Sequence, residues 1–373
     1  MLVLFALREG MPDKCNYGTD SIFIAVSQYF HNVETFHGTS LQFNTIEKLK
    51  FDMYDDINDE LKPWVEMLQS SQVEDRLVAV KTLQHIGDES AIAPLIDALE
   101  DEDTNVQKIA ITTLWELTNP IAVEPLMACL RSPDAEVREE ALSALKELIS
   151  PADLLMLLDK IQEDNFQVQL NVLILLRKIH DAQALPYVLP FFESERAELR
   201  EAAVTTLRYL NQVETCPPVL ALMNDESPQV RREATLTLGY LQDREVVELL
   251  CRALTNDPDW QVRGRAARSL ALHKDARAIP SLTQALRDEH WQVRKFTART
   301  LQEIANDSAI PALIKCLTDE YSDIRRDAAI ALGNIGNPDV LNALQQTLDD
   351  PDADVRIFSQ KAIAKIRQQQ VAS

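Results

Sequence analysis

Residues 230–239, Val-Arg-Arg-Glu-Ala-Thr-Leu-Thr-Leu-Gly, contain the pattern that decides the fold of this chain. An aliphatic residue followed by a polar or basic one opens the stretch, and this pair recurs every 31 residues, with one step of 32. The nine pairs are Val106-Gln107, Val137-Arg138, Val168-Gln169, Leu199-Arg200, Val230-Arg231, Val262-Arg263, Val293-Arg294, Ile324-Arg325 and Val355-Arg356. A sustained period of roughly 20 to 50 residues is typical of a solenoid, in which each unit buries its apolar face against its neighbours.

Within each repeat, apolar or small residues follow the aliphatic marker at offsets 0, 4, 7 or 8, and 11, which is the spacing of one helical stripe. Val137, Ala141, Leu145 and Leu148 illustrate the pattern. Offsets 2, 5, 6 and 9 are expected to line the opposite, inner face. An apolar segment precedes these helices, and prolines stand in the first turn of several such segments: Pro94, Pro125, Pro186, Pro280 and Pro311. Each repeat is therefore predicted to be a helical hairpin.

About ten such hairpins fit between Asp59 and Arg367, which predicts an all-α fold: a right-handed α-solenoid, or α-α superhelix, over residues 53–370. Residues 1–52 lack the period and hold six of the eleven phenylalanines. Two interpretations of this N-terminal extension stay open. It is either a real, disordered extension or sequence that is not natively translated because the start lies at Met53.

Composition narrows the function classes. The chain carries 37 basic and 59 acidic residues, a net charge of −22, which argues against nucleic-acid binding. No stretch approaches the ~20 apolar residues of a membrane span. The five cysteines are Cys15, Cys129, Cys216, Cys251 and Cys316. Their odd number and wide spacing match neither a disulfide framework nor a metal-binding motif. We expect a cytoplasmic protein with no metal and no catalytic residues, since no Ser-His-Asp order or Gly-rich phosphate loop is present.

The combination of Val-Arg, a following Ala and a later Leu-Gly resembles HEAT-like repeats of the phycobilisome-lyase type. The residues that carry this likeness are Val230-Arg231, Ala234 and Leu238-Gly239, then Val262-Arg263, Ala266 and Leu270, then Ile324-Arg325, Ala328 and Leu332-Gly333. The resemblance implies a protein-interaction scaffold that handles phycobiliproteins of a cyanobacterial phycobilisome. It also leaves open a bilin lyase subunit that attaches or removes a bilin chromophore. Similar repeats form deoxyhypusine hydroxylases, but no histidine here is followed by the glutamate of their di-iron sites.

Basic residues gather in one part of the repeat array. Residues 228–299 contain 13 basic and 9 acidic residues, a net charge of 13 − 9 = +4. The candidate binding groove comprises Arg232, Arg265, Arg268, Lys295, Arg299, Arg326, Trp260 and Trp291. Such a groove attracts an acidic protein surface or carboxylates, and the indoles suit a flat anionic ligand or an interface. The alternatives are cations paired with the protein's own acids, and tryptophans packed against the adjacent hairpin turn.

Two further expectations concern packing. The arginine that follows each marker is expected to form a ladder of hydrogen bonds to aspartates between adjacent repeats, with Asp134, Asp259 and Asp352 as acids just before the helices. Tyr209 and Tyr240, at offset 10 of successive repeats, either line the edge of the groove or flank the core, and flanking the core is the expected arrangement.

Overall fold

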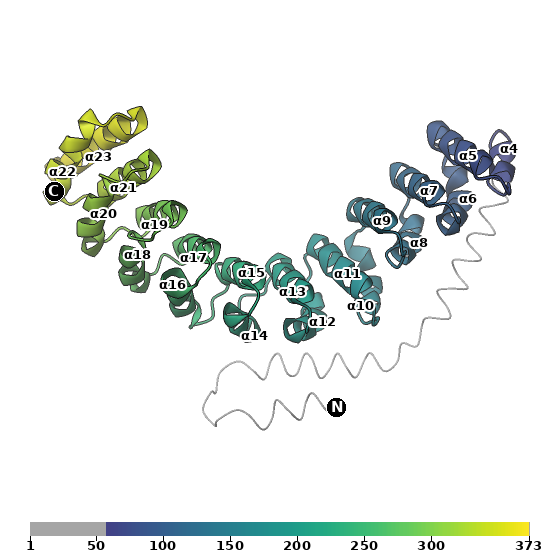
Figure 1. Cartoon of the computed structure of the whole chain (residues 1–373), viewed down its shortest axis with the longest axis horizontal. Coiled ribbons are helices and arrows are strands. Elements are labelled where there is room, and N and C mark those ends of the chain that lie inside the picture. Colours follow the sequence, from purple (N-terminus) through teal and green to yellow (C-terminus); the bar gives the residue numbers. More distant parts are fainter. Residues whose placement is uncertain (1–56, 373) are drawn as a thin grey trace, which may run out of the picture.

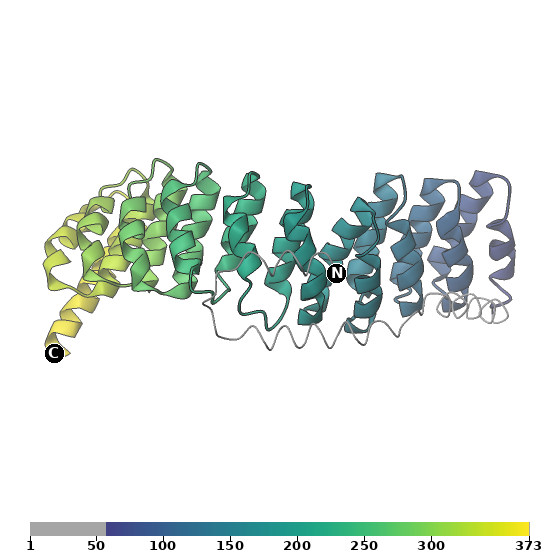
Figure 2. The same cartoon turned by 90° about the horizontal axis from the view of Figure 1, so that it is seen from below.

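The computed structural model describes residues 57–372. The predicted N-terminal extension, 1–52, and the start proposed at Met53 lie outside the described residues. Within them the chain forms helices and connecting turns with no strand, arranged as a long crescent (Figure 1). Figure 2, turned by 90°, shows successive hairpins side by side in a single row. The prediction of an all-α solenoid is confirmed. No helix between residues 57 and 372 combines the length and apolar character needed to cross a bilayer.

Ten hairpins make up the described row, each with a short outer helix followed by an inner one. The outer helices are α4 (Lys62–Met67), α6 (Ile92–Asp97), α8 (Val123–Cys129), α10 (Leu154–Lys160), α12 (Leu185–Val188), α14 (Pro217–Leu220), α16 (Val246–Asn256), α18 (Ile279–Ala285), α20 (Ile310–Cys316) and α22 (Leu341–Gln346). The inner helices are α5 (Val73–Ile86), α7 (Thr104–Glu116), α9 (Ala135–Leu148), α11 (Phe166–Ile179), α13 (Ala197–Tyr209), α15 (Pro228–Leu238), α17 (Trp260–His273), α19 (Trp291–Glu303), α21 (Ser322–Ile335) and α23 (Ala353–Ala372). In Figure 1, helices α7 to α21 of the inner set line the concave side.

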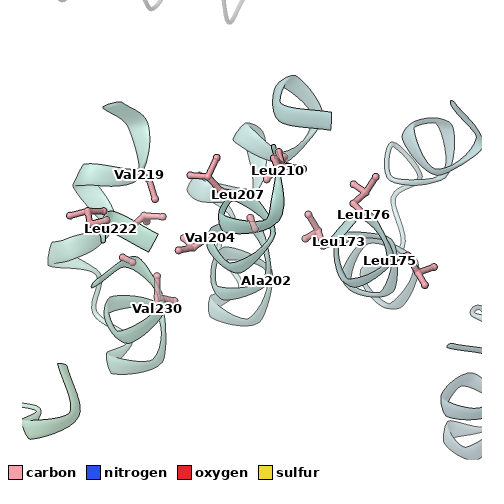
Figure 3. Packing of buried hydrophobic residues seen from close by; sticks show 14 of the residues in the cluster. Leu173, Leu175, Leu176, Ala202, Val204, Leu207, Leu210, Val219, Leu222 and Val230 are labelled. Carbon is pink, nitrogen blue, oxygen red and sulfur yellow. The ribbon is translucent and has the colours of Figure 1, made fainter. Parts of the chain in front are cut away.

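The predicted apolar stripe forms the core. Val137, Ala141 and Leu145 are buried, as are the residues at the same offsets of the other inner helices from α7 to α23. One expectation about the inner face was wrong, because offset 5 is also buried in most of the inner helices. Leu173 and Val204 occupy this offset and point from their own helix toward the next inner helix of the row (Figure 3). A solenoid helix is covered on its flanks by the preceding and following repeats, so its buried arc is wider than one stripe.

Local sequence fixes where the helices begin and how closely they pack. The Asp134 carboxylate accepts a hydrogen bond from the Val137 amide and caps α9. Gly333 allows α21 and α23 to approach closely, because a Cβ there would lie 2.6 Å from the Cβ of Ala362. The hairpins are thus positioned by the turn before each inner helix and by small residues at the crossings.

Candidate functional site on the concave surface

The arginines that follow the markers fix the frame of this surface. Arg263 donates from Nε and Nη2 to the two carboxylate oxygens of Asp288 in the next hairpin, at 2.7 and 3.0 Å, and from Nη1 to the backbone oxygen of Asp257, at 3.0 Å. Six pairs of this kind occur among residues 57–372. They are Arg76–Asp101, Arg200–Asp225, Arg231–Asp257, Arg263–Asp288, Arg294–Asp319 and Arg325–Asp350. The expected Arg–Asp ladder therefore exists.

The aspartates of the ladder differ from the expected ones. Asp259 Oδ1 accepts hydrogen bonds from the backbone amides of Gln261 and Val262 and so caps its own helix. Asp134 and Asp352 likewise bond to backbone amides of the helices they precede. The ladder partner is the acid two residues earlier in the turn, as Asp257 is for Arg231. The three acids named from the sequence are thus helix caps rather than ladder partners.

The six basic residues of the candidate groove lie on α15, α17, α19 and α21, and five of them form ion pairs with acids of the same surface. The pairs are Arg232–Asp259, Arg265–Glu233 (2.6 Å), Lys295–Asp323, Arg299–Asp327 (2.9 Å) and Arg326–Asp323 (2.8 Å). Asp323 and Asp327 lie outside residues 228–299, so the positive charge of that segment is partly balanced by the next hairpin. This geometry corresponds to the alternative in which the cations pair with the protein's own acids.

Arg268 differs from the other five. Its side chain is exposed and makes no ion pair with any of residues 57–370, and its guanidinium carbon lies 5.5 Å from the centre of the Phe296 ring. Arg299 occupies the same offset one repeat later, and its side chain is 52% exposed although it contacts Asp327. The positive charge that is available to a partner is therefore concentrated at Arg268 and Arg299.

A network of paired charges connects helices α13, α15 and α17. Glu233 on α15 accepts hydrogen bonds from Arg208 at 3.1 Å and from Arg265 at 2.6 Å. Burial alone would raise the pKa of Glu233, but the hydrogen bond from Arg265 and the two positive charges outweigh it and hold the pKa below its usual range. Burial, together with the charge of Glu233, raises the pKa of Glu201 on α13. The centre of the concave surface is thus an ordered network rather than a loose set of cations.

The two tryptophans each stack on a residue of the next hairpin. The Trp260 ring lies 3.9 Å from that of His290, at 5° between planes, and the Trp291 ring lies 5.0 Å from that of Tyr321, at 16°. Both tryptophans are half-buried at the first position of their helices. One face of each indole is therefore covered by the following turn, which is the geometry of the packing alternative.

Sequence reasoning missed a row of exposed apolar side chains. Tyr209, Tyr240 and Leu272 are 41%, 60% and 55% exposed, and they lie at or next to the C-terminal ends of α13, α15 and α17. The expectation that the two tyrosines flank the core was wrong, and their exposure agrees with the other arrangement weighed for them, at the edge of the groove. On the helical wheel, offset 10 lies about 80° from the centre of the inner face and well away from the buried stripe. Large apolar residues at this offset in three successive repeats could therefore have indicated an exposed apolar row. We call these three residues the Tyr/Leu row.

Arg208 connects the Tyr/Leu row to the charged network. Its guanidinium carbon lies 5.6 Å from the centre of the Tyr209 ring, and it donates to Glu233. A partner that contacts the row would therefore also meet the charged residues of α15 and α17.

Reactive groups are scarce in the described part of the chain. Burial raises the pKa of the Cys129 and Cys216 thiols to about 11 and that of Cys316 to about 12, so these cysteines are protonated and unreactive at neutral pH. Within residues 57–372 no three His, Cys, Asp or Glu side chains are grouped so that they could hold a metal ion. The surface is suited to binding by shape, apolar contact and charge.

Comparison with known structures gives matches over most of the chain. An engineered protein is 24% identical, with a TM-score of 0.49 and coverage of 83% of this chain and 99% of its own. A chain from the structure of RanGDP with Kap95p is 14% identical, with a TM-score of 0.57 and coverage of 86% and 52%, so this chain spans about half its length. Human deoxyhypusine hydroxylase in complex with glycerol is 20% identical, with a TM-score of 0.31 and coverage of 83% and 96%.

No match was found among curated proteins. The family description of HEAT repeats matches residues 61–146, 216–291 and 279–364, which together are more than half of the chain. These ranges cover helices of both halves of the crescent. They include Tyr240, Leu272 and all eight residues of the candidate groove. On this evidence the chain belongs to the HEAT repeat family.

Proposed function

We propose that this protein is an interaction scaffold that binds a protein partner through the Tyr/Leu row together with Arg268 and Arg299. The observation that carries the proposal is the row itself, because three large apolar side chains stay exposed at equivalent positions of consecutive hairpins. Contiguous exposed apolar side chains beside polar ones mark interaction surfaces. Tyrosine and arginine are also enriched among residues that dominate binding energy. The similar fold in the structure of RanGDP with Kap95p shows that such a solenoid occurs in a protein complex.

The chemistry of the surface specifies the kind of partner. Tyr240 and Leu272 offer apolar contact area, and Arg268 offers a guanidinium that has no counter-ion among residues 57–370. An acidic segment that also carries an apolar side chain satisfies both features at once. The ion-paired cations around them keep the surface rigid, so that binding requires little reorganisation.

The proposal is tested by cross-linking the tagged protein to its partners in cells of its source and comparing three forms by quantitative mass spectrometry. Wild type and an Arg252→Glu variant, which makes the same charge change on outer helix α16, are expected to retain the same partners. A Tyr240→Ala/Arg268→Glu variant is expected to lose them. Equal recovery with all three forms would contradict a binding role for the row.

The resemblance of the repeats to the phycobilisome-lyase type makes a phycobiliprotein the specific partner to test first. Co-expression with phycobiliprotein subunits and a bilin, followed by co-purification, gives a direct answer. Co-purification without covalent chromophore supports a scaffold. Zinc-induced fluorescence of the denatured subunit would instead indicate that the protein acts as a bilin lyase subunit.

A further inference from the structure

The Arg–Asp ladder is interrupted at three successive contacts between hairpins, from α7 to α13. At the first of these, between α7 and α9, Gln107 occupies the arginine position and Ser132 the aspartate position. Gln107 Nε2 donates to the backbone oxygen of Asp101 at 2.7 Å, which reproduces the bond that Arg263 makes within its own turn. The shorter glutamine makes no bond to the following hairpin. The ladder connection is therefore missing here.

The glutamine leaves one acceptor without a partner. Because Nε2 donates to a carbonyl oxygen, the other amide atom must be Oε1, and this atom is buried with no hydrogen-bond partner among the described residues. A buried polar atom without a partner costs free energy and indicates that a donor from outside would be bound favourably. At the six ladder contacts, an arginine side chain of the protein itself supplies donors at this position.

A pocket of about 550 Å³ lies at the same contact, lined mainly by α8, by the turn that follows α8 and by the segment that follows α6. Ile96, Leu99 and Val137 contribute to its apolar walls, and Gln107 and Ser132 are part of its lining. At the preceding contact, where the ladder is intact, a recess of about 460 Å³ has the pair Arg76 and Asp101 in its lining instead. At the contact between α7 and α9 the Arg–Asp pair is missing, and a pocket lined by apolar groups and Gln107 takes its place.

The charges at the rim of the pocket leave a negative excess. Arg131 and Lys160 line it, but both pair with Glu163. Glu100 and Glu124 also line it and make no ion pair with any of residues 57–370. The surrounding part of the chain, residues 57–199, has 11 basic and 27 acidic residues, a net charge of 11 − 27 = −16. A cationic ligand is therefore attracted to this end of the solenoid.

We propose that the pocket receives an arginine side chain of a partner protein, which takes the place of the missing ladder arginine. The aliphatic stem would pack against the apolar walls. The planar guanidinium has five N–H donors, enough to reach the Gln107 oxygen and the carboxylates of Glu100 and Glu124. This site lies at the turn between outer helix α8 and inner helix α9 and involves none of the residues of the Tyr/Leu row, so it adds a second point of contact to the proposed scaffold.

The experiment uses the full chain with labelled methyl groups and follows the NMR signals of Ile96, Leu99 and Val137. The probe is N-acetyl-arginine-N-methylamide, and the matched control is the neutral citrulline compound of the same shape. We expect the arginine probe to shift these three signals in the millimolar range, as befits a single side chain, and the citrulline compound to bind at least about tenfold more weakly. Absence of shifts, or equal affinity for citrulline, would overturn the proposal.

Two variants test whether the missing ladder pair is the cause. Gln107→Arg/Ser132→Asp rebuilds the pair and fills the pocket, so it should abolish probe binding without lowering Tm. Glu100→Gln/Glu124→Gln keeps the shape and removes the uncompensated charge, so it should weaken probe binding by at least about threefold while the fold is retained. Unchanged affinity in either variant would count against the proposal. Tyr240→Ala/Arg268→Glu should leave probe binding intact, which separates this proposal from the concave-surface function.

Discussion

The guanidinium group of Arg263 is joined to the carboxylate of Asp288 by two parallel hydrogen bonds, although the two residues belong to different hairpins. Their side chains are only 10% and 9% exposed. A fork of this kind holds both the distance and the orientation between neighbouring repeats. In a solenoid each repeat contacts only its neighbours, so the stability of each contact between hairpins is close to a local property.

Removing one member of the Arg263–Asp288 pair tests whether the ladder stabilises its own contact between hairpins. Arg263→Ala leaves Asp288 buried without its counter-ion, and we expect the free energy of unfolding of this part of the chain to fall by roughly 3 kcal/mol or more. Hydrogen exchange of α17 and α19 would report the loss locally. Arg252→Ala, an exposed arginine on the outer helix of the same hairpin, should have little effect. A cost below about 1 kcal/mol for Arg263→Ala would show that the ladder orients the repeats without stabilising them.

The ladder also predicts how stability depends on pH. The hydrogen bond from Arg325 lowers the pKa of Asp350. Burial would raise the pKa of Asp225, but the hydrogen bond from Arg200 outweighs burial, so the pKa of Asp225 is also lowered. A carboxyl with a lower pKa in the folded state contributes stability that is complete above its unfolded pKa of about 3.9 and is lost as the pH falls through the folded value. Urea unfolding should therefore show a steep loss below about pH 4. Asp350→Asn should lose stability at neutral pH and show a shallower acid dependence than wild type.

The sequence was sufficient for the periodic part of the fold. Offsets 0 and 4, as in Val137 and Ala141, are buried in every hairpin after the first and face the same core, so a single stripe predicts them correctly. Offset 5 was misassigned because burial of Leu173 and Val204 depends on the next hairpin, which a helical wheel does not contain. The periodic pattern describes one repeat, whereas the flanks of each helix are decided by the contact between repeats.

The candidate site was harder to predict for a related reason. Asp257 and Asp259 lie in one turn, and only their geometry shows that the first bonds to Arg231 and the second caps α17. The counter-ions of the basic residues lie about one repeat away, as Asp323 does from Lys295. Charge counting over a segment could therefore identify where cations gather, but it could not show that, of the six groove cations, Arg268 alone makes no ion pair with residues 57–370.

The contact between α9 and α11 is expected to open first. Arg138 has no aspartate partner in the next hairpin, because Glu163 at the corresponding position pairs with Arg131 and Lys160. These two inner helices also pack against each other less extensively than any other neighbouring inner pair of the described row. Native-state hydrogen exchange should show lower protection in α9 and α11 than in α17 and α19. Uniform protection along the row would contradict this expectation.

Replacing Trp291 separates packing from ligand binding at the aromatic stacks. Trp291→Ala removes the stack on Tyr321, and the stacking interaction alone is worth about 0.5 to 1.5 kcal/mol in addition to the buried area. Trp291→Phe keeps an aromatic ring there and should retain most of the stability. Thermal unfolding of the two variants is the measurement. If both keep the wild-type Tm while partner binding is lost, the indole serves the interface rather than the packing of the hairpins.

The sharpest test of the concave surface is a single charge reversal at Arg268. Reversing Lys295 or Arg299 would also break their bonds to Asp323 and Asp327, so a loss of binding there could reflect a disturbed surface. Arg268 has no such bond, and Arg268→Glu should leave Tm nearly unchanged. If it contacts an acidic partner, the affinity should fall by about 2 kcal/mol, or roughly thirtyfold, and the affinity of wild type should decrease with salt because exposed charges are screened over ~8 to 10 Å. Calorimetric titration with the captured partner, with Arg252→Glu as the control, measures both effects. Equal affinities of Arg268→Glu and wild type at low salt would exclude Arg268 from the interface.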